Sequence, residues 1–193
     1  MPTFYQPGRA GLRTNMLPGD ILINNNTFAP SHCGVVINGL GVIHATNKGI
    51  VEHDISEWGS AADMFRLRTP PTTAEAGRVT NIAQEIMKSA VYGMARAAFK
   101  STFSTHTAGS GLQQRLAKYR ERLRDNQGVV KNVYCSELVI LSYQLACING
   151  GKIDETNRLF IKLDGKHTWP STLRRYLRAH IGWRELGEFK PAG

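Results

Sequence analysis

The sequence has 193 residues, which is enough for one domain with a sizeable hydrophobic core. Its 24 lysines and arginines against 15 aspartates and glutamates give a formal net charge of +9, which favours an anionic partner or surface. We expect neither a secretory signal peptide nor a disulfide framework, because the first residues contain no apolar run and the three cysteines lack CxxC or zinc-ligand spacing.

The chain is predicted to begin with an irregular segment over residues 1–17. Pro18-Gly19-Asp20 is typical of a turn, and the apolar residues 21–23 after it predict a first strand. No charged side chain occurs between Ile21 and Asn47, but five asparagines, a proline and two histidines in this stretch argue against a membrane span.

A β-hairpin with two histidines is predicted over residues 31–46, because apolar residues alternate there and Asn38-Gly39 favours a tight turn. A two-residue turn would place His32 on the same face as Ile43 and Ala45. We favour instead a three-residue loop over residues 37–39, which sets His32 directly opposite His44. This register gathers one apolar face and one histidine face; the apolar face holds Cys33, Val35, Ile43 and Ala45.

Further strands are predicted within residues 51–63 and at 64–67, before Pro70-Pro71 interrupts the chain. A helix capped by Thr72 or Thr73 should follow, because its apolar residues keep helical spacing. These residues are Val79, Ile82, Ala83, Ile86, Ala90 and Met94.

The second half of the chain predicts a polar loop and three helices. The loop covers residues 101–111, and a basic amphipathic helix covers residues 112–126 with Leu112, Leu116, Tyr119 and Leu123 on one side. An apolar helix is predicted from Asn132, as its N-cap, to Ile148, and Gly150-Gly151 should end it. Thr168-Trp169-Pro170 predicts the start of the last helix.

Cys135 is the strongest candidate for a nucleophile, because it falls in the first turn of a predicted helix. The positive end of the helix dipole and the unpaired amides of the first turn stabilise a thiolate. A nearby histidine can accept the thiol proton and a third polar group can orient that histidine. We assign these roles to His32 and His44, with the backbone N–H of Cys135 as an oxyanion donor and its thiol expected at the surface.

The order PGDIL, SHCGVVI, VIHA and YCSEL resembles the NlpC-type papain-like cysteine peptidases and amidases. The two histidines precede the cysteine, and in this the chain is similar to the circularly permuted branch, which includes the lecithin:retinol acyltransferase-like enzymes. The resemblance implies that Cys135 is the nucleophile, His32 the base and His44 the third member. It also implies, more weakly, that Tyr134 shapes the oxyanion region.

The fold implied by the resemblance is α+β, a papain-like fold in which a small antiparallel sheet packs against helices. We expect a single permuted NlpC-like catalytic domain over residues 1–193 with a basic helical insertion around 100–128. The implied activity is cysteine-dependent hydrolysis of amide bonds in the peptides of bacterial peptidoglycan, without a cofactor or metal. Without a signal peptide, such an enzyme would be made in the cytoplasm. It would then be exported by a specialised secretion system, such as type VI, to the periplasm of a target cell, where an immunity protein could oppose it.

Two other functions stay open. The permuted branch also permits a lipid acyltransferase, thioesterase or phospholipase, whose basic helix at 112–126 would rest on anionic lipid. A basic binding module without catalysis is the other alternative. Nucleic acid is not an expected partner, because aromatic residues do not alternate with the basic residues in that helix.

The remaining cysteines and histidines receive no catalytic role. Cys33 and Cys147 are predicted to lie in the core. A zinc site formed by His32, His44 and Cys135 is a minor alternative that lacks an evident fourth ligand. The other histidines show no paired spacing; they are His53, His106, His167 and His180.

Overall fold

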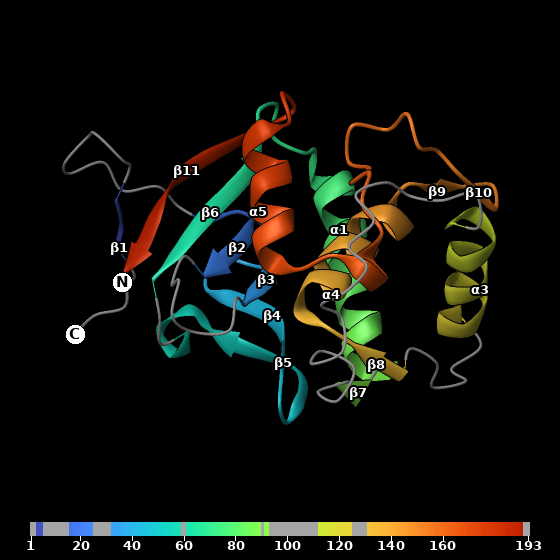
Figure 1. Cartoon of the computed structure of the whole chain (residues 1–193), viewed down its shortest axis with the longest axis horizontal. Helices are drawn as coiled ribbons and strands as arrows, with labels where there is room; N and C mark the ends of the chain where they lie inside the picture. The colour runs from blue at the N-terminus through green and yellow to red at the C-terminus, as the bar shows by residue number, and fades with distance from the viewer. Residues whose placement is uncertain are drawn as a thin grey trace.

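The computed structural model of the chain describes residues 3–5, 16–24, 32–58, 61–89, 91–92, 112–124 and 131–190. The architecture of this part is α+β, with helices packed on a seven-stranded sheet (Figure 1). The strand order is β1-β11-β6-β2-β3-β4-β5, and every neighbouring pair is antiparallel. The strands are β1 (Thr3–Tyr5), β2 (Ile21–Asn24), β3 (Cys33–Val36), β4 (Gly41–Thr46), β5 (Gly49–Asp54), β6 (Ala62–Leu67) and β11 (Trp183–Lys190).

The two faces of the sheet carry separate hydrophobic clusters, because side chains alternate along each strand. Cys33, Val35 and Ile43 belong to the larger cluster, which includes residues of the helices. Val36 and Val42 belong to a smaller cluster on the opposite face. The predicted division of the 31–46 hairpin into two faces is therefore confirmed for its described residues.

The predicted register of this hairpin is wrong by two residues. Gly34 pairs with His44 and Val36 with Val42, and the backbone N–H of Ile37 donates to the carbonyl of Gly41, so the loop is Asn38-Gly39-Leu40. The Asn38 side chain stabilises this loop, because its Oδ1 accepts from the backbone N–H groups of Leu40 and Gly41 at 3.0 and 2.6 Å. His32 thus lies diagonal to His44 and not directly opposite it.

Gly34 explains why this register brings the strands so close beside His44. A Cβ atom at Gly34 would lie 2.8 Å from the carbonyl oxygen of Ile43 and 3.0 Å from the Cβ of His44. A larger residue at this position would have to push β3 and β4 apart. The absence of a side chain at Gly34 therefore allows β3 and β4 to approach closely at His44.

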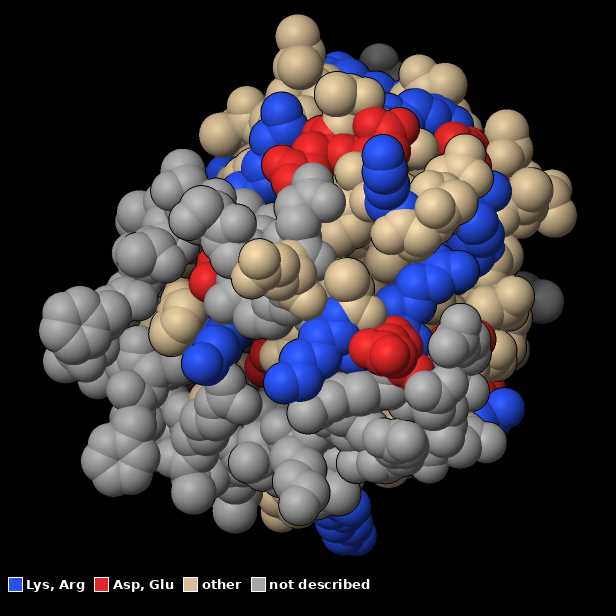
Figure 2. Space-filling model, turned by 90° about the vertical axis from the view of Figure 1, so that its right-hand side faces the viewer, with Lys and Arg blue, Asp and Glu red and all other residues tan. Residues whose placement is uncertain are grey.

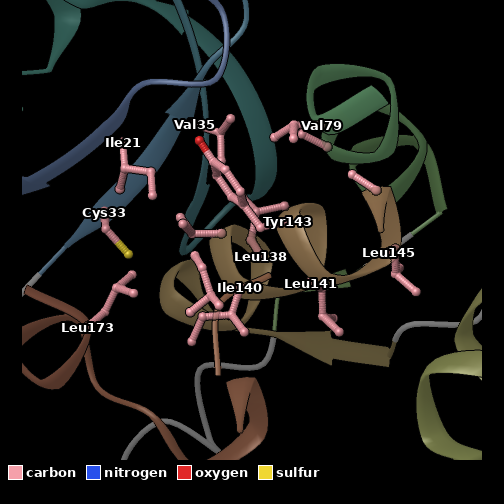
Figure 3. Packing of buried hydrophobic residues seen from close by; sticks show 14 of the residues in the cluster. Ile21, Cys33, Val35, Val79, Leu138, Ile140, Leu141, Tyr143, Leu145 and Leu173 are labelled. Carbon is pink, nitrogen blue, oxygen red and sulfur yellow. The ribbon is translucent and has the colours of Figure 1, made fainter. Parts of the chain in front are cut away.

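Helix α4 is the central helix of the fold, and each of its 12 residues is buried. It packs against α1 and strand β3, and Figure 3 shows Tyr143 and Leu138 of this helix on the side of Val35 and Ile21 of the sheet. This confirms the expectation that the cysteine helix faces the strand next to His32. The helices are α1 (Thr73–Ser89), α3 (Leu112–Arg124), α4 (Cys135–Ala146) and α5 (Pro170–Ala179), with short 3-10 helices η1 (Ile55–Glu57) and η3 (Gly165–His167).

Both predicted ends of α4 are wrong. Asn132 is not the N-cap, because it lies in strand β8 (Lys131–Val133), which pairs in parallel with β7 (Val91–Tyr92), and Tyr134 is the N-cap. The helix ends at Ala146, before Ile148, because β9 (Ile148–Asn149) pairs with β10 (Lys152–Ile153). Gly150-Gly151 forms the turn between them, with φ angles of 56° and 81°.

The start of α1 confirms the predicted cap. Thr72 Oγ1 accepts from the backbone N–H of Glu75 at 3.2 Å, and Glu75 Oε2 accepts from the backbone N–H of Thr72 at 2.8 Å. This reciprocal pair is a capping box. The start of α5 is also as predicted, with Pro170 in the first turn after Trp169.

The turn at Gly19-Asp20 is held by buried polar contacts. Asp20 accepts two hydrogen bonds from the Arg66 guanidinium, at 2.6 and 2.5 Å, and one from the backbone N–H of Leu17 at 2.8 Å. Burial raises the pKa of Asp20, and the Arg66 charge partly opposes that shift. The hydroxyl of Tyr143 donates to the carbonyl of Gly19, which ties α4 to the start of β2.

Candidate active site

Three elements bring the predicted site residues together. His32 comes directly before β3, His44 lies in β4, and Cys135 is the first residue of α4. The Nε2 atom of His32 lies 2.6 Å from the Nδ1 atom of His44. Cys135 in turn is hydrogen-bonded to His32. The structure thus places a thiol, a histidine and a second histidine in one hydrogen-bonded chain.

Cys135 is buried, with 8% of its surface exposed. The prediction that its thiol lies at the surface is therefore wrong. Its pKa is lowered well below the ordinary value of a thiol. The largest cause is a hydrogen bond with the Cys33 side chain, followed by the hydrogen bond with His32 and the charge of His32, while burial acts in the opposite direction. The start of α4 favours the thiolate further through its dipole.

His44 is kept neutral by its surroundings. Only 6% of its surface is exposed, and burial lowers its pKa to about 3, with smaller contributions from the charges of His32 and His53. A neutral imidazole has one donor and one acceptor nitrogen. His44 can therefore orient His32 through a hydrogen bond, but at neutral pH it does not become charged.

The low pKa of His44 predicts that the protein loses stability as the pH falls from about 6.5 toward 3. Over that range the unfolded chain binds a proton at His44 that the folded chain does not, so the free energy of unfolding decreases. The largest decrease in the free energy of unfolding is a few kcal/mol, because each unit of difference in the pKa of His44 between the folded and unfolded chain corresponds to about 1.4 kcal/mol. Urea unfolding of wild type and His44→Asn between pH 7 and 4.5 should show a shallower pH slope in the variant. Equal slopes would contradict a neutral His44.

His53 also belongs to the hydrogen-bonded chain of Cys135, His32 and His44, although the sequence analysis gave it no role. Its Nδ1 atom lies 3.1 Å from Nε2 of His44, and the two ring centroids are 4.9 Å apart. The missing signal was the register of the next hairpin, in which Thr46 pairs with Gly49 and Val42 with His53. A two-residue turn at Asn47-Lys48 sets His53 on the same face of the sheet as His44.

Trp58 covers the histidines. Its ring centroid lies 5.0 Å from that of His32 and 5.1 Å from that of His44, and 8% of its surface is exposed. Tilted aromatic contacts at this distance are favourable and restrict ring rotation. Trp58 therefore helps to fix the orientation of both imidazoles. No feature of the sequence alone marked it, because residues 55–58 enter the site only through the fold.

Tyr134 lies directly before the nucleophile candidate, as the N-cap of α4. Its side chain makes no capping hydrogen bond to the helix, and 4% of its surface is exposed. Its backbone carbonyl accepts from the N–H of Leu138 at 2.8 Å and so closes the first turn. This places Tyr134 beside the start of α4, where the amides of the first turn lie.

The other cysteines are in the core, as predicted. Cys33 and Cys147 are buried, and all three cysteines are reduced thiols. Burial, followed by the charge of Asp154, raises the pKa of Cys147 to about 12. Of the remaining histidines, His167 lies in η3 and His180 follows α5, while His106 is outside the described residues.

The zinc alternative finds no support in the described part of the chain. No group of three His, Cys, Asp or Glu side chains among those residues is arranged to hold a metal ion. Both ring nitrogens of His44 face other imidazoles, at 2.6 and 3.1 Å. A zinc ion would have to separate these rings.

Helix α3 confirms part of the predicted basic amphipathic helix. Leu116 is buried and Tyr119 packs against the main hydrophobic cluster, while Lys118 and Arg120 are exposed. Figure 2 shows the face of the molecule on this side, where lysine and arginine side chains lie among acidic ones. The side chains of Leu112, Arg115, Arg122, Leu123 and Arg124 are outside the described set.

No helix in the part of the chain that the structure describes is both long and apolar enough to cross a membrane.

The sequence matches no protein-family model, and comparisons with curated proteins and with solved structures find no match either.

Proposed function

We propose that the protein is a thiol-dependent hydrolase in which Cys135 is the nucleophile, His32 the general base and His44 the residue that orients His32. The observation that carries this proposal is the hydrogen-bonded chain from Cys135 through His32 to His44, with 2.6 Å between the two imidazoles. The low pKa of Cys135 supports it, because the thiolate is the reactive form.

The protonation states follow from the geometry. Nε2 of His32 is engaged by His44, so Nδ1 is the nitrogen left for the thiol. His32 takes the thiol proton at Nδ1, and the thiolate attacks the carbonyl carbon of the substrate. The tetrahedral oxyanion is stabilised by N–H groups at the start of α4, including that of Cys135.

The intermediate collapses when the C–N bond breaks and His32 gives its proton to the leaving amine. A thioester remains on Cys135. His32 then takes a proton from water, the hydroxide attacks the thioester carbonyl, and the thiolate leaves as the acid is released. Because His44 stays neutral throughout, the only positive charge of the cycle sits on His32 beside the thiolate.

We also propose a papain-like fold of the permuted NlpC type, as the sequence resemblance implies. The antiparallel sheet, the two histidines before the cysteine, and Cys135 at the start of a buried helix support this assignment. The proposed substrate is a peptide amide of bacterial peptidoglycan. A role as an exported antibacterial effector opposed by an immunity protein is the corresponding biological proposal.

One argument for the lipid-directed alternative, that the basic amphipathic helix rests on anionic lipid, is weakened. An amphipathic helix that rests on a membrane buries its apolar side among lipids. In α3 the two described residues of that side pack against the protein, since Leu116 is fully buried and Tyr119 is half-buried. Any contact of α3 with an anionic surface would thus be electrostatic, through residues such as Lys118 and Arg120.

The proposed function is tested by incubating the protein with purified peptidoglycan and, separately, with anionic phospholipid vesicles, followed by mass spectrometry. We expect new peptide fragments from an amide cut, and none with a Cys135→Ala variant. Release of fatty acid or lysophospholipid would support the lipid enzyme instead. Binding of either material without products would support the binding module.

Reversing the charge of α3 should weaken action on an anionic polymer and leave action on a small soluble substrate unchanged. Lys118→Glu with Arg120→Glu should lower the rate on the polymer by about 30-fold or more at low salt, because each of the two cations near an anionic surface contributes about 1 kcal/mol and about 1.4 kcal/mol corresponds to a factor of ten. The difference should shrink in 1 M salt, where the Debye length is about 3 Å.

A matched control is the pair Arg175→Glu and Arg184→Glu, two exposed residues on α5 and β11 with the same change in net charge. This pair should retain most of the activity on the polymer. Equal losses on both substrates at every salt concentration would mean that α3 supports the active site and is not a docking surface.

A further inference from the structure

His53 extends the chain of imidazoles by one residue. It lies in β5 and is half-buried, and its Nδ1 faces Nε2 of His44 at 3.1 Å. The interplanar angle of 66° directs the edge of one ring toward the other. His53 also lines a shallow hollow of about 280 Å³, together with Asn38, Leu40, Gly41, Glu52 and Asp54. The chain thus runs from a buried thiol to a histidine that water can reach.

The hydrogen positions along this chain are fixed by one requirement. Whether His32 is neutral with its hydrogen on Nε2 or is protonated at both nitrogens, it donates from Nε2 to His44. His44 must therefore accept at Nδ1. Because His44 is neutral, its single hydrogen is then on Nε2, which points at His53. His53 must accept this hydrogen at its own Nδ1.

The other tautomer of His44 would interrupt the hydrogen-bonded chain of imidazoles. A hydrogen on Nδ1 of His44 would face the hydrogen on Nε2 of His32 across only 2.6 Å. The acceptor that His53 offers favours the productive tautomer over this one, as a partner of a functional histidine does in general. Trp58, which packs on the rings of His32 and His44, offers no acceptor atom, because an indole nitrogen only donates.

We propose that His53 is a positioning residue, which holds His44 in the tautomer with hydrogen on Nε2 so that His44 can accept from His32. This inference rests on the proposed function of Cys135, His32 and His44, and adds a fourth member to their chain.

The test compares three variants. His53→Leu removes the acceptor, whereas His53→Asn puts an amide oxygen close to the place of Nδ1. His180→Leu is the matched control, because His180 is also half-buried and its Nδ1 also accepts one hydrogen bond, from the backbone N–H of Gly182 at 3.1 Å. Three quantities are measured for each: the rate of Cys135 alkylation by iodoacetamide, the rate of hydrolysis, and the ¹⁵N signals of His44.

We expect His53→Leu to slow both reactions about 10- to 100-fold, the range found when outer partners of metal-ligating histidines are removed. His53→Asn should recover much of this loss, and His180→Leu should match wild type. In wild type and His53→Asn, the ¹⁵N spectrum should show a protonated Nε2 and an unprotonated Nδ1 on His44. In His53→Leu the two tautomers should mix.

Two results would overturn the proposal. One is a His53→Leu variant with wild-type rates and an unchanged His44 tautomer. The other is an equal loss in His53→Leu and His53→Asn with the tautomer unchanged, since this would show a purely structural role. Alkylation and the ¹⁵N spectrum need no substrate, so they decide the role of His53 even if the wild-type protein hydrolyses nothing and the proposed function fails.

Discussion

Replacing Cys135 with alanine is expected to abolish hydrolysis, with a loss of about 10⁶-fold, the size found when a nucleophile is removed from a catalytic triad. In the proposed mechanism the thioester forms on this sulfur alone, so the variant has no other route to hydrolysis. Cys135 is buried in the main cluster, so the substitution also leaves a small space there. Cys135→Ser fills that space and should be nearly as inactive, and thermal unfolding should show both variants folded.

The same assignment predicts the order in which the three cysteines react with iodoacetamide. Cys135 should be alkylated first, because its pKa is lowered and 8% of its surface is exposed. Cys33 is fully buried, and the pKa of Cys147 is raised to about 12, so both should react only when the protein unfolds. Peptide mass spectrometry after brief labelling gives the order. Earlier labelling of Cys33 or Cys147 would contradict the choice of nucleophile.

The elements that the sequence predicted well are those with a regular apolar period or a strong local signal. The capping box at Thr72 and the proline at the start of α5 are local signals, and both are confirmed. The period of two in the 31–46 hairpin correctly separated its two faces. Along a strand, the face to which a side chain points depends only on whether its residue number is odd or even. The predicted faces are therefore correct although the predicted register is wrong by two residues.

The elements that were missed depend on contacts between distant segments. Strand β1 pairs with β11, which lies at the opposite end of the sequence, and β11 carries an irregularity between Glu185 and Gly187 that hides its alternation. Gly187 has a φ of 148° there. The short strand β8, which displaced Asn132 from the predicted cap, also needs a distant partner, β7.

The candidate site likewise contains residues that local patterns predict and residues whose positions depend on contacts between distant segments. Cys135, His32 and His44 were predicted because a helix start and two strand positions could be located from local patterns. His53 and Trp58 were missed, since their places beside His44 follow from the register of β5 and from the turn after it. The hydrogen bond between Cys135 and Cys33, the largest cause of the low thiol pKa, depends likewise on how α4 packs on β3.

His32 and His44 should be unequal in their effect on activity. In the proposed mechanism His32 accepts and returns the proton, so for His32→Ala we expect a loss of about 10²- to 10⁴-fold, the usual contribution of general acid–base catalysis. His44→Ala should cost less, because His44 stays neutral and handles no proton; it only holds the ring of His32 through the 2.6 Å hydrogen bond. Trp58 still packs on His32 in that variant and keeps part of its orientation.

The measurement is kcat and KM for both variants on a small soluble amide, with His180→Leu as a control outside the chain. His44→Asn should lie above His44→Ala, because its amide can again accept a hydrogen bond near Nδ1. Equal losses in His32→Ala and His44→Ala, with stoichiometric zinc in the purified wild-type protein, would point to two ligands of one metal ion. Equal losses without zinc would mean that His32 cannot act as a base unless His44 holds it, which would make the orientation of His32 as important as its basicity.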